Sequence, residues 1–291
     1  MSFKAFAESH GLILRDLISD GRWHRTPTLS KPKKKNGAYL FDGVRGVVKD
    51  WATEGFATWR KEGARSKVGR AVARDITRSL QAQRERYARS RMEAASIIAG
   101  CVRDTHPYLA AKGFPGTQGL IHPSGDLVIP MRDCLDYGTI NSVQRISADG
   151  AKLFLSGGKA KGSIFVIGKG AWHERWLCEG YATGLSVQAA LLDLRRQAEI
   201  IVTFSASNLQ YVSQFVKRPA YVMADHDKKS TAGKDAAIAT GLPWVMPEEP
   251  GFDANDLHQQ CGLRALVKLI QAEWSTTTIR EMHEMSSSAA R

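Results

Sequence analysis

The feature that most constrains the fold is an alternation of short apolar runs with helical patterns between residues 172 and 272. Four apolar runs of strand length occur there, at residues 175–178, 199–204, 220–224 and 243–246. The segments that separate them have the spacing of apolar residues typical of helices. Because alternating strands and helices build a mainly parallel sheet flanked by helices, this part of the chain is predicted to be an α/β domain.

Acidic residues follow two of these predicted strands directly. Glu179 and Gly180 come after the first strand, and Asp225 and Asp227 come after the third. The carboxyl ends of parallel strands lie at one edge of a sheet, where ligands bind in open α/β sheets. Carboxylate oxygens at such an edge suit Mg²⁺ or Mn²⁺, and a divalent ion would offset the repulsion between them. Glu179, Asp225 and Asp227 are therefore predicted to form a metal site.

Each acid also has a more ordinary interpretation when taken alone. Glu179 would be a favourable negative charge at the start of the helix that follows it, and Asp225 or Asp227 would be a helix N-cap. A further acidic pair, Asp253 and Asp256, lies after the last predicted strand. The grouping of all these acids after strands of one α/β unit favours metal binding, with Asp253 and Asp256 as additional candidate ligands.

The composition favours a polyanionic partner. The chain has 41 basic and 29 acidic residues, which gives a net charge of +12, and nucleic acid is the leading candidate, although many basic proteins share this bias. No apolar stretch approaches the ~20 residues that cross a bilayer, and the N-terminus lacks the apolar core of a signal peptide. We therefore expect a cytoplasmic protein without a membrane partner.

Five segments of different character follow one another along the chain. They are a small β-rich module at 1–59, a basic helical linker at 60–100, a basic β-rich block at 101–170, the α/β domain at 171–272 and a polar tail at 273–291. The linker has arginines at helical intervals, and a solvated helix without a ligand explains it equally well.

The N-terminal module contains aromatic and basic residues that could bind a single strand of DNA. The lysines lie in a cationic loop that either binds phosphates or is a solvated turn, and the aromatics either stack on bases or belong to the core of the module. These candidates are Trp23, His24, Lys33, Lys34, Lys35, Tyr39 and Trp51. The four cysteines stand far apart and none precedes Cys101, so neither a zinc ribbon nor a disulfide framework is indicated, and no zinc is expected.

Three motifs in the last part of the chain resemble the Toprim domain that bacterial-type primases, topoisomerases and some nucleases share. They are Trp176-Leu-Cys-Glu-Gly180, then Met223-Ala-Asp-His-Asp227 with the Ala232-Gly-Lys234 segment, and Asp253-Ala-Asn-Asp256. Within that superfamily, the run Glu179-Gly-Tyr-Ala-Thr-Gly184 is more similar to phage and plasmid primases than to topoisomerases. The resemblance implies that Glu179 is the catalytic acidic residue and that Asp225 and Asp227 bind the metal.

The block before the α/β domain resembles the basic subdomain of the same primases. Its segments His106-Pro-Tyr-Leu-Ala-Ala-Lys-Gly113, Leu127-Val-Ile-Pro-Met-Arg132 and Ser142-Val-Gln-Arg-Ile146 carry the likeness. In that family, basic side chains hold the phosphates of template and nucleotide. The corresponding candidates in this chain are Arg145, Lys152, Lys159, Lys161 and Lys234.

The function that this resemblance implies is synthesis of short RNA primers from ribonucleoside triphosphates on single-stranded DNA, with Mg²⁺ or Mn²⁺. Glu179 would be either a metal ligand or a general base. No phosphate-binding G-x-x-x-x-G-K-[ST] motif is present, so a replicative helicase is a candidate partner and not an activity of this chain. Two alternatives stay open, namely a Toprim nuclease and a non-catalytic single-stranded-DNA-binding accessory protein.

Overall fold

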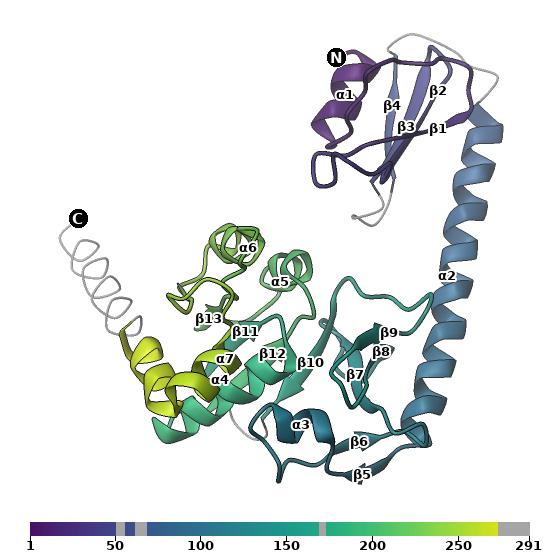
Figure 1. Cartoon of the computed structure of the whole chain (residues 1–291). Coiled ribbons are helices and arrows are strands. Elements are labelled where there is room, and N and C mark those ends of the chain that lie inside the picture. The colour runs from purple at the N-terminus through teal and green to yellow at the C-terminus, as the bar shows by residue number, and fades with distance from the viewer. Residues whose placement is uncertain (51–55, 62–68, 169–172, 273–291) are drawn as a thin grey trace. The chain divides into compact units, whose positions relative to one another are not determined.

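The structure is a computed structural model that describes residues 1–50, 56–61, 69–168 and 173–272. The chain divides into two units, Met1–Gln83 and Arg84–Arg291, and most of their elements are labelled in Figure 1. The polar tail predicted at 273–291 and the candidate Trp51 lie outside the described residues.

The described part of the first unit is a four-stranded antiparallel sheet with one short helix and the start of a long one, and the unit extends past the module predicted at 1–59 to Gln83. Its elements are α1 (Phe3–Ser9), β1 (Trp23–Thr26), β2 (Gly37–Phe41), β3 (Arg45–Asp50) and β4 (Ala57–Arg60), with strands in the order β1-β2-β3-β4. The ring of Phe3 on α1 stacks on Phe41 at 4.5 Å between ring centroids. It lies directly over Gly46, where a Cβ would overlap the ring, so a glycine in β3 lets the helix pack closely.

A single long helix, α2 (Gly69–Ala99), covers most of the helical linker predicted at 60–100. From Arg84 onward most of its basic side chains are exposed. Ala94 is buried against Val128 and Val143, and the Arg91 guanidinium donates a hydrogen bond to Asn141 Oδ1 at 2.9 Å. The last turns of α2 are therefore fixed on the second unit.

The second unit contains one mixed sheet of ten strands. Its strands are β5 (Val102–Asp104), β6 (Gly119–Ile121), β7 (Leu127–Asp133), β8 (Ile140–Ile146), β9 (Lys152–Phe154), β10 (Ser163–Ile167), β11 (Glu174–Cys178), β12 (Ala198–Val202), β13 (Ala220–Met223) and β14 (Trp244–Val245). Its helices are α3 (Pro107–Ala111), α4 (Tyr181–Asp193), α5 (Ala206–Val212), α6 (Ala232–Thr240) and α7 (Ala254–Cys261), followed by helical residues 263–272.

The strand order is β14-β13-β11-β12-β10-β7-β6-β5, and β8 joins β7 to β9. The strands β14, β13, β11 and β12 are mutually parallel, whereas β10 is antiparallel to β12. The predicted mainly parallel sheet is therefore the parallel part of a larger mixed sheet. None of the helices among the described residues combines the length and apolar character needed to span a bilayer.

Alternating side chains of the parallel strands fill two cores, one on each face of the sheet. Trp176 and Cys178 of β11 pack in the core that includes α4 and α7. Leu177, which points to the opposite face, packs in the core that includes α5 and α6. Helices therefore cover both faces of the parallel strands (Figure 1), as the period of two in a strand requires.

Strand β10 joins the two blocks that the sequence distinguishes at 101–170 and 171–272. Its first residues, Ser163 and Ile164, pair with β7, and residues 165–167 pair with β12. Both blocks consequently share one sheet and lie in the same unit.

Candidate active site

Glu179 stands where the polypeptide leaves β11 and enters α4, at the carboxyl edge of the parallel strands. Gly180 is the N-cap residue of α4 and makes no side-chain capping bond. Four residues later, Gly184 lies so close to the sheet that a Cβ would come within 2.9 Å of Ile167 Cδ1 and 3.0 Å of Val202 Cγ2. Gly184 thus allows the start of α4 to pack closely on the sheet, directly after the residue that carries the Glu179 carboxylate.

The carboxyl group of Glu179 is half-buried beside other acids. Burial and the negative charge of Asp227 raise its pKa from 4.5 to about 7, although the Ala206 amide donates a hydrogen bond that opposes the shift. A carboxyl group with this pKa exchanges its proton near neutral pH.

Asp225 follows β13, the neighbour of β11 in the sheet. Burial, followed by the charges of Glu179, Asp253 and Asp227, raises the pKa of Asp225 well above its ordinary value. Its Oδ1 atom is enclosed and has no hydrogen-bond partner among the described residues. An enclosed carboxylate oxygen without a partner is costly, and a cation is the group that would satisfy it.

Asp227 is exposed and serves the start of α6. Its Oδ2 atom accepts hydrogen bonds from the Gly233 amide at 3.2 Å and from the Ser230 hydroxyl at 3.0 Å. Asp227 therefore has the helix-start role that the sequence left open. The bonds of this role use one of its two carboxylate oxygens, Oδ2.

Asp253 and Asp256 form a capping box at the start of α7. Asp253 Oδ1 accepts the amides of Asn255 and Asp256, while its Oδ2 accepts the Thr183 hydroxyl at 3.1 Å. Asp256 Oδ2 in turn accepts the Asp253 amide at 3.2 Å. Only Asp253 of this pair raises the pKa of Asp225, so Asp253 belongs to the acidic cluster and Asp256 is engaged mainly in capping.

The acids gather at one edge but do not form a closed coordination shell. Within the part of the chain that the structure describes, no three His, Cys, Asp or Glu side chains are arranged to hold one metal ion. Their chemistry nevertheless fits Mg²⁺ or Mn²⁺, because all donors are oxygens and Asp225 Oδ1 lacks a partner. Mg²⁺ in nucleotide enzymes is commonly held by one or two carboxylates, with waters and substrate phosphates completing its shell.

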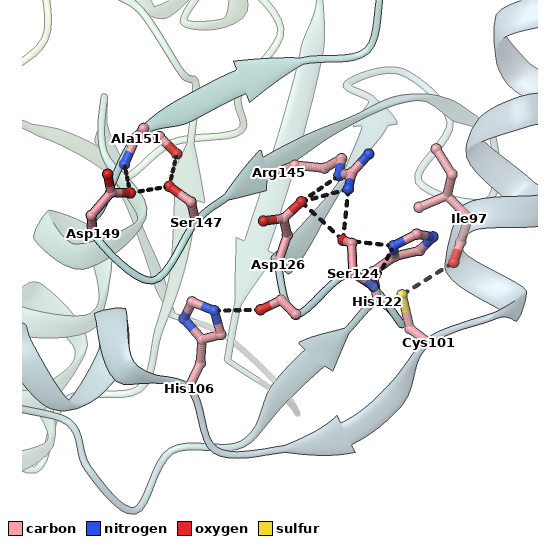
Figure 2. Close-up of polar contacts among 11 residues, drawn as sticks. Ile97, Cys101, His106, His122, Ser124, Asp126, Arg145, Ser147, Asp149 and Ala151 are labelled. Atoms are coloured by element: carbon pink, nitrogen blue, oxygen red, sulfur yellow. Dashed lines mark hydrogen bonds and ion pairs between the residues drawn. The ribbon is translucent and has the colours of Figure 1, made fainter.

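Arg145 of β8, a predicted phosphate-binding residue, bonds side chains of the turn at 122–126. Its Nε atom donates to Asp126 Oδ2 at 2.9 Å, and one terminal nitrogen donates to the Ser124 hydroxyl at 2.7 Å. Ser124 also contacts His122 Nδ1, and Figure 2 shows this chain of polar contacts. Arg145 therefore holds the 122–126 turn in place.

The predicted lysines differ in their surroundings. Lys152 on β9 is exposed, and its positive charge lowers the pKa of Asp225, so it lies near the acidic cluster. Lys159 pairs with Asp133 at 3.1 Å, and Lys161 lies over the Tyr211 ring at 4.5 Å. Lys234 is exposed on α6.

The N-terminal candidates are divided between core and surface. Tyr39 is only 3% exposed, and its hydroxyl accepts the Ile18 amide at 3.1 Å, so it takes the core role that the sequence left open. Trp23 is 38% exposed. The ring of His24 contacts Asp20, with Nε2 at 2.7 Å from the carboxylate. The three lysines, Lys33, Lys34 and Lys35, are exposed in the turn before β2.

Sequence reasoning missed two features near the acidic cluster. Phe204, the last residue of the strand predicted at 199–204, instead lies beyond the end of β12. It adopts a left-handed φ of 68°, and its amide donates to the Glu179 carbonyl at 2.9 Å. Lys228 and Lys229, which directly follow Asp227, are exposed cations. They add positive charge beside the acids without any motif that marks them.

No family model matches the chain. Among solved structures, the chain is similar to the primase fragment of the bacteriophage T7 primase-helicase protein, with 18% identity and a TM-score of 0.37 over 50% of this chain. It is also similar to a chain in a structure of the bacteriophage T7 lagging-strand DNA polymerase with primase domains bound to an RNA/DNA hybrid and dTTP, with 20% identity and a TM-score of 0.35 over 50% of this chain and 76% of that one. The match covers 62% of the T7 primase fragment.

Proposed function

We propose that this chain is a DNA primase of the Toprim type, which makes short RNA primers on single-stranded DNA by metal-dependent nucleotidyl transfer. The observation that carries the proposal is the enclosed, unpartnered Oδ1 of Asp225 beside Glu179 at the carboxyl edge of parallel strands. The motifs around these two residues, which resemble phage and plasmid primases, supply the choice of reaction.

Glu179, Asp225 and Asp227 would hold Mg²⁺ or Mn²⁺, and Asp253 would add negative charge from the start of α7. When bound, the ion would supply positive charge that orients the triphosphate and stabilises the pyrophosphate leaving group. Because coordination by one or two carboxylates leaves room for phosphate oxygens, the open arrangement of these acids is compatible with such a role.

The protein's own groups would bind phosphate and move a proton. Lys152, Lys228 and Lys229 place exposed positive charge around the acids, where it would neutralise phosphate oxygens. Glu179, with a pKa near 7, can accept a proton at neutral pH and is the candidate general base for the attacking 3′-hydroxyl. Exposed Trp23 and the lysine turn of the first unit would contact the single-stranded template.

The experiment combines the purified full-length chain with single-stranded DNA of varied sequence, ribonucleoside triphosphates and Mg²⁺ or Mn²⁺. We expect labelled RNA of primer length. Glu179→Gln and Asp225→Asn should each lower synthesis at least about a hundredfold, with DNA affinity retained. Asp193→Asn, at an exposed acid on α4 outside the cluster, is the matched control and should retain activity.

Other outcomes would replace the proposal. Metal-dependent nicking of DNA without nucleotides, lost in the same variants, would identify a nuclease. DNA binding that falls with salt but ignores divalent ions and both substitutions, with no RNA on any template, would identify a non-catalytic accessory protein.

A further inference from the structure

A pocket lies on the face of the sheet that α5 covers, away from the acidic edge. It has a volume of about 320 Å³, and its lining includes Cys134, Leu135, Arg175, Glu199, Val216 and Lys217. Arg175 stands at the start of β11, four residues before Glu179, which corresponds to about 13 Å along an extended strand. The pocket and the acidic cluster are therefore separate sites.

The pocket lies beside the short helix α5, which contributes Val212 to its lining. A helix of seven residues rises about 10 Å, whereas the five-residue strands beneath it extend about 17 Å. Leu177 and Ile201, near the carboxyl ends of β11 and β12, are buried in the core beneath α5. Arg175 and Glu199, which are register partners nearer the amino ends, instead face the pocket.

The floor of the pocket carries a hydrogen-bond acceptor without a partner. Glu199 is 2% exposed, and its Oε2 atom pairs with Arg175 Nε at 3.0 Å. Its Oε1 atom is enclosed and makes no hydrogen bond of normal geometry with any described residue, while burial and the nearby Glu199 carboxylate raise the pKa of the Tyr137 phenol. A buried carboxylate oxygen that lines a cavity and lacks a donor favours a ligand that brings an N–H or O–H group.

The rim of the pocket is apolar and basic. Leu135 and Phe215, which line the pocket, are 69% and 42% exposed, and large apolar side chains gathered at a cavity mouth commonly mark a binding site. Tyr137 is 40% exposed and brings a phenol hydroxyl close to the Glu199 carboxylate. Lys217 is exposed at the same mouth and forms no ion pair with a described residue. Because Arg175 neutralises Glu199, Lys217 leaves the pocket with one net positive charge.

These features together select the ligand. The apolar walls favour a flat ring, the free Oε1 of Glu199 favours a neutral N–H donor, and Lys217 favours an anionic substituent outside the cavity. We propose that this pocket binds one nucleotide, with the base enclosed, an N–H of the base donating to Glu199 Oε1, and the phosphate at Lys217. The nucleotide is either a free mononucleotide or one residue of a single-stranded DNA.

The test measures protection of Cys134, which lines the pocket, against alkylation by N-ethylmaleimide. The full chain is titrated in EDTA, which silences any divalent-metal site, with the four deoxynucleoside monophosphates and, separately, with short single-stranded oligonucleotides. We expect a saturable slowing of Cys134 labelling of about fivefold or more at saturation. Labelling of Cys261, an exposed thiol on α7, should not change and serves as the internal control.

Two variants and calorimetry make the result independent of thiol reactivity. Lys217→Gln should weaken binding about tenfold, and Val216→Trp, which fills the cavity, should abolish it. Lys268→Gln and Ile238→Trp introduce the same two residues at exposed positions outside the pocket and should bind like the unmodified chain. Isothermal titration calorimetry in EDTA should give the same ranking.

Each outcome either supports or overturns nucleotide binding in the pocket. Protection by oligonucleotides at concentrations where mononucleotides fail assigns the pocket to a DNA strand, and the reverse assigns it to a free nucleotide. Equal protection by inorganic phosphate would show that the base is not enclosed and would overturn the proposal. Absence of protection and of binding heat for every probe would also overturn it, whether or not the chain makes RNA.

Discussion

Gly233 lies directly against the backbone carbonyl of Asp225, so that a Cβ at this position would overlap the carbonyl oxygen. The amide of the same glycine donates to Asp227 Oδ2. One small residue in the first turn of α6 therefore fixes the backbone of the first aspartate and the side chain of the second.

We expect Gly233→Ala to lower the free energy of unfolding by about 2 kcal/mol, because the added methyl group must displace the loop after β13. The same displacement should weaken divalent-ion binding. Gly116→Ala, where a Cβ meets nothing within 4 Å, is the control and should change stability by less than about 0.5 kcal/mol. Chemical denaturation and metal titration measure the two effects, and equal behaviour of the two variants would contradict this role of Gly233.

The metal-free protein should lose stability as the pH rises from about 5 to 7.5. The pKa of Glu179 is raised from 4.5 to about 7 in the folded chain, so folding favours the protonated form. Its stabilising contribution is complete below the unfolded pKa and is lost as the pH passes the folded pKa. Glu179→Gln should remove about 2 kcal/mol of this decline.

Denaturation curves in EDTA at several pH values test the decline. Added Mg²⁺ or Mn²⁺ at pH 8 should restore stability in the unmodified chain more than in Glu179→Gln, since the ion compensates the ionised acids. A slope that is unchanged in Glu179→Gln would show that other groups cause it.

Substitutions of Asp253 should separate its capping role from its charge. Asp253→Ala removes the acceptor of the Asn255 and Asp256 amides and should cost about 1 kcal/mol. Asp253→Asn keeps an acceptor oxygen and should lower stability by only about 0.3 kcal/mol. It also removes a negative charge near Asp225. Divalent-ion affinity should fall in both variants, and an Asn variant as unstable as the Ala variant would contradict this separation.

Lys152 and Arg145 should respond to substitution in opposite ways. Lys152→Gln should weaken nucleotide binding severalfold without a change in stability, because this exposed lysine lies near Asp225. Arg145→Gln should lower stability by about 1 kcal/mol, because it leaves Asp126 without its ion pair, and should leave nucleotide binding unchanged. Thermal denaturation and nucleotide titration distinguish the two, and the reverse pattern would refute these assignments.

Two aromatic residues of the first unit provide a similar contrast. Tyr39→Phe should lower stability by about 1 kcal/mol, because it removes the hydroxyl that bonds the Ile18 amide, and should leave DNA affinity unchanged. Trp23→Ala should instead weaken single-stranded DNA binding, by about 1 kcal/mol or more if a base stacks on the indole. Fluorescence anisotropy with a labelled oligonucleotide measures the difference. Loss of affinity in Tyr39→Phe alone would reverse the roles.

The sequence predicted the parallel strands well because their apolar runs are short and bounded by turn residues. The run at 220–224 became β13 (Ala220–Met223), and Asp225 follows it as expected. The hydrogen bonds of Asp227 and Asp253 to helix starts were harder to foresee, since the same residue types cap helices and bind metals. The local sequence pattern also could not separate the capping role from the metal-binding role, because only the folded sheet brings Asp253 near Asp225.

The sequence alone does not predict which strands pair when they are far apart in the chain. The partners of β10 are more than 25 residues away on both sides, and no local pattern indicates that one strand serves two neighbours. Arg175 and Glu199 are visible as charges in apolar strands, but their pairing depends on the register of β11 and β12. Tyr39 was ambiguous for a related reason, since burial of an aromatic is decided by the helix packed over it.

The division of β10 between β7 and β12 has a consequence for how the second unit unfolds. A strand that hydrogen-bonds one neighbour with its first residues and another with its last cannot detach from one without loosening the other. Backbone amides of β7 and β12 should therefore exchange with deuterium in a single concerted opening, and a proline at Phe165 should expose both to exchange together.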